Sequence, residues 1–142
     1  MKTLEDLYKY TKDKNIRLKN FIDKENKING MCLYNKNKCN IYMNTNINNE
    51  IEEKCVLAEE IGHYEKGIIQ TKLNDTGDES TLIRSINEFR AKKWAIHEII
   101  PFETFKSYLG TNKSKFEVAN ELEVTEEFID MAYFIYEPLL YS

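Results

Sequence analysis

The sequence is poor in cysteine, and the three that it has, Cys32, Cys39 and Cys55, form no Cys-x-x-Cys pair. An odd number without such a pair argues against a disulfide framework and against a zinc site built from cysteines. We therefore expect reduced thiols that are packed in the interior.

Long apolar runs and an excess of positive charge are also absent. Residues 1–8 carry acidic side chains and lack the apolar stretch of a signal peptide, and no later stretch is long enough to span a bilayer. With 20 Lys and Arg against 24 Asp and Glu, the net charge of -4 provides no field that attracts nucleic acid, although a local basic patch stays open. These absences predict a cytoplasmic protein that binds no membrane and makes no direct contact with nucleic acid.

The hydrophobic residues that are present, 42% of 142, are enough for one core and predict a single domain over residues 1–142. Helical and strand-like spacing both occur, which is typical of an α+β fold. The expected elements are a helix over 3–13, a strand over 16–22, a hairpin of strands over 31–34 and 39–43 around the turn 35–38, a helix capped by Asn49 and stopped by Gly67, a loop at 71–77, a helix over 80–99 capped by Asp78 or Ser80, and helices over 101–109, 114–122 and 125–136.

The apolar spacing also predicts which faces are buried. Alternation in the first strand places Ile16, Leu18 and Ile22 on a covered face. In the helix over 80–99 the apolar faces are expected from Leu82, Ile86 and Phe89 and from Ile83, Trp94, Ala95 and Ile99, and Pro138 is expected to lie beyond the last helix.

The segment from Cys55 to Gly67 carries the pattern that bears on chemistry. As a helix it places Glu59 and His63 four residues apart on one face, with Glu60 beside them. This is the layout of the His-Glu-x-x-His zinc-protease helix, with Glu in the place of the first His. Glu88, on another helix, is the best candidate for a third ligand. On helix composition alone, a solvated acidic face is the competing interpretation of Glu59 and Glu60.

Two motifs together resemble the ImmA/IrrE family of metallopeptidases: residues 57–64, Leu-Ala-Glu-Glu-Ile-Gly-His-Tyr, and residues 88–101, in which Glu88-x-x-Ala91-x-x-Trp94-Ala95 is followed by Ile-Ile-Pro. The resemblance covers nearly the whole chain. It implies a zincin-like minimal metallopeptidase, with a small three-stranded sheet packed on a metal-binding helix and a Glu-bearing helix. The catalytic core would span about residues 1–110, and a helix-turn-helix-like segment about residues 111–142.

By that resemblance, His63 and Glu88 bind the metal, Glu60 is the general base, and Glu59 takes the place of the first His ligand. The metal implied is zinc, and two carboxylate ligands would shift the preference toward manganese or iron. The substrate implied is a helix-turn-helix repressor of a phage or mobile element, which the enzyme cleaves. The alternative is a non-catalytic relative that binds a repressor or other regulator without cutting it.

Two further features are assigned away from the site. His97 follows Glu88 by nine residues, about half a turn out of phase on a helix, so we expect it to point elsewhere. The last helix begins with Glu126 and Glu127, whereas a DNA-recognition helix presents Arg, Asn or Gln. It is therefore expected to pack or to dock a protein, and Cys55 is expected to pack in the core.

Overall fold

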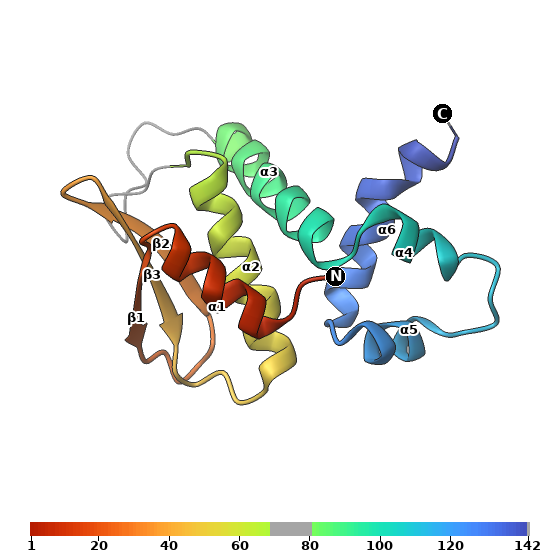
Figure 1. Cartoon of the computed structure of the whole chain (residues 1–142), viewed down its shortest axis with the longest axis horizontal. Coiled ribbons are helices and arrows are strands. Elements are labelled where there is room, and N and C mark those ends of the chain that lie inside the picture. The colour runs from red at the N-terminus through yellow and green to blue at the C-terminus, as the bar shows by residue number, and fades with distance from the viewer. Residues whose placement is uncertain (69–80, 142) are drawn as a thin grey trace.

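The computed structural model of the chain describes residues 1–68 and 81–141, and it confirms the predicted α+β class (Figure 1). The described part contains a three-stranded sheet and six α-helices. None of these helices is long and apolar enough to cross a membrane. In chain order the elements are α1 (Leu4–Asp13), β1 (Arg17–Phe21), β2 (Gly30–Asn35), β3 (Lys38–Asn44), α2 (Glu50–Glu65), α3 (Thr81–Ile99), α4 (Phe102–Ser107), α5 (Lys115–Leu122) and α6 (Glu126–Leu140).

The sheet has the strand order β1-β3-β2, with β1 parallel and β2 antiparallel to β3. Lys36 and Asn37 have positive φ values of 53° and 62°, which fits a two-residue hairpin turn whose twist matches that of the strands. The hairpin itself is as the sequence predicted. Tyr34 pairs with Cys39, so Cys32 and Cys39 lie on the same face of the hairpin. Among the described residues β2 is an edge strand.

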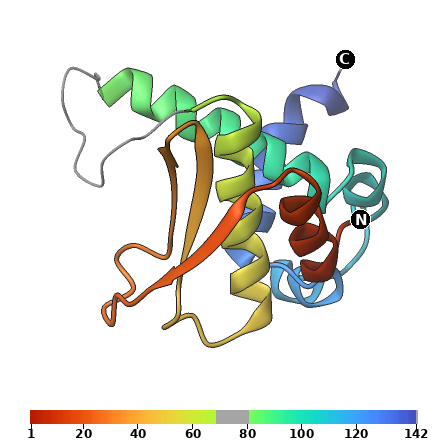
Figure 2. The same cartoon turned by 60° about the vertical axis from the view of Figure 1, so that its left-hand side comes forward.

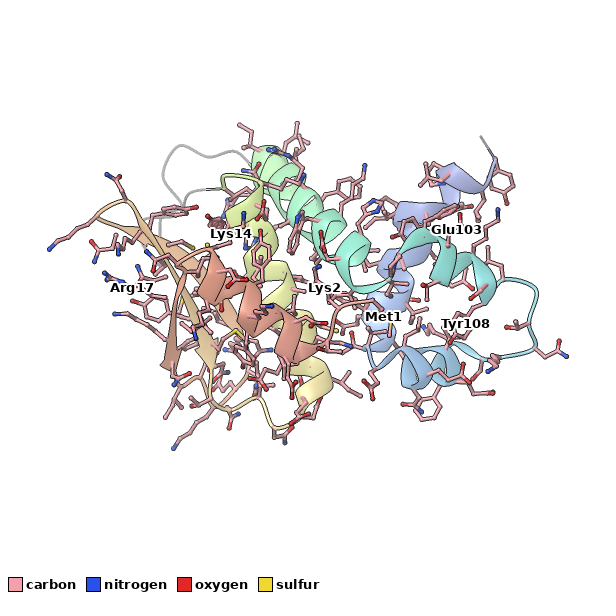
Figure 3. The ribbon with its side chains drawn as sticks, in the orientation of Figure 1. Met1, Lys2, Lys14, Arg17, Glu103 and Tyr108 are labelled. Carbon is pink, nitrogen blue, oxygen red and sulfur yellow. The ribbon has the colours of Figure 1, made fainter. Side chains whose placement is uncertain are left out.

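The prediction of a half-buried first strand was wrong in part. Ile16 is buried, but Leu18 is 38% exposed and Ile22 is 69% exposed. Among the described residues β1 is an edge strand bonded to β3, and little of the fold lies over Leu18 and Ile22. Figure 3 shows Arg17 of β1 at the end of the molecule opposite to Glu103 and Tyr108, which belong to the C-terminal helical part.

Helix α2 is the central element, because it lies between the sheet and α3 (Figure 2). Its limits are as predicted: the Asn49 side chain accepts a hydrogen bond from the Glu52 N–H, and Gly67 has φ +65° just after the last turn. Buried positions extend round most of the helix, since it has neighbours on both sides. They are Lys54, Cys55, Leu57, Ala58, Glu60, Ile61 and Gly62.

Helices α2 and α3 approach each other closely where both carry small residues. A Cβ atom added at Gly62 would lie 2.3 Å from the carbonyl oxygen of Ala91. Ala91 and Ala95 are fully buried. This close crossing brings the second half of α2, with its candidate site residues, against the helix that carries Glu88.

The first half of α3 differs from the prediction. Leu82 is 69%, Ile83 and Ile86 are each 49%, and Phe89 is 38% exposed, so an inward apolar face was the wrong expectation there. The buried hydrophobic residues described in α3 start at Ala91, where the helix crosses Gly62. The proposed caps of α3, Asp78 and Ser80, and the loop at 71–77 lie outside the described residues.

The C-terminal helices begin as predicted. Ser114 and Glu117 form a capping box at α5, and the Thr125 side chain accepts from the Phe128 N–H at α6. Helix α6 does not stop before Pro138 but continues to Leu140. Pro138 lies in the last turn, where the missing N–H removes one backbone hydrogen bond close to the helix end.

Candidate active site

His63 is the centre of the candidate site, held between carboxylates from two helices. Its Nδ1 lies 2.9 Å from Oε1 of Glu60, one turn earlier on α2. Its Nε2 lies 2.9 Å from Oε1 of Glu88 on α3. The fold therefore brings together three of the four residues that the sequence singled out, and it does so across the close crossing of α2 and α3.

This arrangement defines the protonation state of the imidazole. An ionised carboxylate only accepts hydrogen bonds, so both ring nitrogens of His63 donate, as they do in the imidazolium ion. Burial lowers the pKa of His63, but the hydrogen bonds and charges of Glu60 and Glu88 outweigh it and raise the pKa to about 10. The same contact holds the pKa of Glu88 below its usual value.

Glu60 is held in place by the sheet as well as by His63. It is 7% exposed, and a Cβ atom added at Gly30 would lie 2.9 Å from its Cγ and 3.0 Å from its Oε2. The backbone of β2 therefore rests against the Glu60 side chain, and only glycine permits this approach. A solvated face, the competing interpretation, is wrong for Glu60.

Glu59 belongs to the same cluster of charges but not to its hydrogen bonds. It is half-buried, and among the described residues it makes no hydrogen bond to His63 or Glu88. Burial raises the pKa of Glu59 to about 7; the nearby carboxylates Glu60 and Glu88 add to this effect, and Lys92 opposes it.

One imidazole and two carboxylates are side chains of the types that bind divalent cations in proteins. His63 Nε2 and Glu88 Oε1 face each other, so an ion bound by the pair would replace the proton between them. Glu59 is a further carboxylate in an acidic cluster. Within residues 1–68 and 81–141, however, no three His, Cys, Asp or Glu side chains are gathered around one point that would hold an ion. The structure thus places two of the three proposed ligands side by side.

Two grooves border the site and contain a residue that the sequence analysis missed. The hairpin groove, about 690 Å³, runs between Gly30 of β2 and the start of α6 and contains Glu59 and Glu60. The helix groove, about 790 Å³, runs between α3 and α6 and contains Glu88. Lys92 lines both grooves. Lys92 follows Glu88 by four residues, and this spacing could have predicted that both lie on the same face of the helix.

The residues assigned away from the site lie away from it. His97 Nδ1 is 3.3 Å from the hydroxyl of Tyr136 on α6, which confirms that it points elsewhere. All three cysteines are free and buried, which confirms that they pack in the interior. Cys32 and Cys39 have their sulfur atoms 3.1 Å apart on the hairpin.

Comparison with known proteins identifies the family. A family model described as the IrrE N-terminal-like domain, peptidase family M78, matches residues 11–133. No curated protein and no solved structure matches the chain. The matched range includes α2, α3 and every residue of the candidate site. The chain therefore belongs to peptidase family M78, the family of IrrE N-terminal-like domains.

Proposed function

We propose that this chain is a metal-dependent endopeptidase that cleaves a protein, a helix-turn-helix transcriptional repressor of a phage or mobile element. The family match supports a metallopeptidase-type function. The observation that carries the proposal is the contact of His63 with both Glu60 and Glu88. The buried carboxylate of Glu60 thus lies beside the pair formed by the His63 imidazole and the Glu88 carboxylate.

In this proposal His63 and Glu88 hold the metal, and Glu59 is the third ligand. Zinc is the metal proposed first, with manganese or iron as alternatives because two of the ligands are carboxylates. The chemistry supplied by such an ion is polarisation of the scissile carbonyl and acidification of water. The protein contributes the donors and the groups that orient them.

Glu60 is the general base and later the general acid. It takes a proton from the attacking water and gives it to the leaving amine. The hydrogen bond from His63 Nδ1 and the contact with the backbone of β2 fix its position, which is what proton transfer within hydrogen-bond reach requires. Because β2 is an edge strand among the described residues, its free edge can pair with an extended substrate next to Glu60.

The test uses the full chain and the helix-turn-helix repressor encoded nearest to its gene, incubated with zinc or manganese and analysed by mass spectrometry. A defined pair of fragments is expected, and Glu60→Gln is expected to abolish it. Glu65→Gln, an exposed position on the same helix, is the matched control and should cleave normally. Unchanged cleavage by Glu60→Gln would contradict the role of Glu60.

A non-catalytic function is the second candidate, and Glu59 is the observation in its favour. This residue stands where the family pattern has a first His, and it does not join His63 and Glu88 in the described structure. A relative of this kind would bind the repressor and leave it intact. A stable complex with uncut partner after incubation with each metal would support this function over cleavage.

A further inference from the structure

The hairpin groove and the helix groove meet at the candidate site and form one trough. Lys92, Glu127 and Met131 line both grooves. The two grooves also hold the two carboxylates that His63 connects, Glu60 in the first and Glu88 in the second. An extended peptide lying in the trough would therefore pass over Glu60, the proposed general base.

The helix groove offers an apolar seat for one large side chain. Phe89 of α3 and Phe134 of α6 meet edge to face with ring centroids 5.8 Å apart. Phe89 is 38% exposed and Phe134 is 66% exposed, so both rings remain accessible to a ligand. Met131 lines the same groove. A bulky apolar or aromatic side chain gains most from burial against such a surface.

The charge of the trough selects against acidic peptides. Carboxylates outnumber basic side chains along the two grooves, and Asp130, on the wall of the helix groove, is already paired with Lys115 at 3.2 Å. A chain with positive side chains on either side of the apolar anchor complements this surface. Glu60 and Glu88 are likewise paired with His63, and Lys27 with Glu25. The remaining carboxylates are Glu52, Glu59, Glu126 and Glu127, against Arg84 and Lys92.

We propose that the trough is the substrate-binding site, and that it takes a basic extended segment with one bulky apolar side chain packed against the exposed faces of Phe89 and Phe134. This inference rests on the proposed function, since it names the substrate class of the same site. In it, Glu126 and Glu127 at the start of α6 receive the basic side chains, which gives the acidic last helix a protein-docking role.

The test is a fluorescence anisotropy titration of the full chain with labelled peptides of about ten residues, enough to span the trough when extended. The first peptide is lysine-rich with one central Phe. The second replaces Phe by Ala, and the third replaces Lys by Glu. We expect the second to bind about ten-fold more weakly and the third not to bind at all.

Protein variants locate the binding. Phe134→Ser and Glu127→Lys should each weaken the first peptide about ten-fold or more. Phe116→Ser, 60% exposed on α5, and Glu137→Lys, exposed on α6 outside both grooves, are the matched controls and should bind normally. Equal binding by the groove variants and the wild type, or tight binding of the acidic peptide, would overturn the proposal.

The outcomes separate this proposal from the proposed function. In one outcome the peptide binds, the groove variants weaken its binding, and it is not cut in the presence of zinc or manganese. This outcome supports the trough as a binding site and contradicts the peptidase activity. Cleavage of the repressor that is unaffected by Phe134→Ser and Glu127→Lys supports the activity and overturns the trough.

Discussion

Replacing Gly62 by Ala tests whether the close crossing of α2 and α3 is what assembles the site. The added Cβ would lie 2.3 Å from the carbonyl oxygen of Ala91 and 3.0 Å from its carbonyl carbon. The oxygen is about 1 Å closer than an ordinary van der Waals contact. Both atoms belong to a helix backbone, which cannot rotate out of the way, so the two helices must separate.

The expected cost follows from two opposing effects. Ala is about 1 kcal/mol better than Gly in the interior of a helix, which favours the variant. Overpacking a well-packed interior costs about 1–3 kcal/mol, and a contact with rigid backbone lies at or above the upper end. The net loss should be about 2 kcal/mol, or a fall in Tm of about 5–8 °C for a chain of this size.

The assay is thermal and urea unfolding of metal-free protein, with Gly67→Asn as the control. Gly67 has φ +65°, which Asn tolerates, and a Cβ there would meet nothing within 4 Å. Its Tm should change little. A Gly62→Ala variant as stable as the wild type, or more stable, would refute the close crossing, because helix propensity would then be acting without a clash.

Two further predictions concern the titration of the site in metal-free protein. The His63 imidazole, observed by NMR, should titrate near pH 10, and Glu88→Gln should lower that midpoint; a midpoint near 6.5 in the wild type would mean that the two carboxylates do not bridge it. Its raised pKa gives stability that is complete below pH 6.5 and is lost as the pH rises toward 10. Glu59 also has a raised pKa, 4.5 to about 7, so its folded form keeps a proton that the unfolded chain releases, and stability falls as the pH rises through that window. Glu59→Gln should remove about 2 kcal/mol of this decline after allowance for solvent screening, as measured by urea unfolding at pH 4.5 and 7.5, and an unchanged slope would contradict the assignment.

Local features were predictable because neighbours in the sequence decide them. The spacing of Glu59 and His63 on one helical face depends only on helix geometry. The caps at Asn49 and Thr125 depend on a side chain reaching an N–H two or three residues ahead. The hairpin depends on a turn of two residues that accept positive φ. These features, with the family resemblance, were enough to identify the fold class.

Only the tertiary structure decided burial and pairing between elements. Glu59 and Glu60 are adjacent and identical in the sequence and line the same groove, yet Gly30 and the backbone of β2 cover Glu60, while Glu59 is only half-buried. Leu18 and Leu82 fit buried patterns but are exposed, because no described element covers β1 or the start of α3 at those positions.

The contact of His63 with Glu88 joins residues 25 positions apart and depends on how closely α2 and α3 cross. Periodicity tells which side of an element is apolar, but what lies against that side depends on how distant segments pack. The sequence by itself therefore determined which side chains share the face of one helix, and the family resemblance added their predicted roles as ligands and base. The tertiary structure decided that Glu60, His63 and Glu88 form one connected group, that Glu59 stands beside it, and that Lys92 lies between the two grooves.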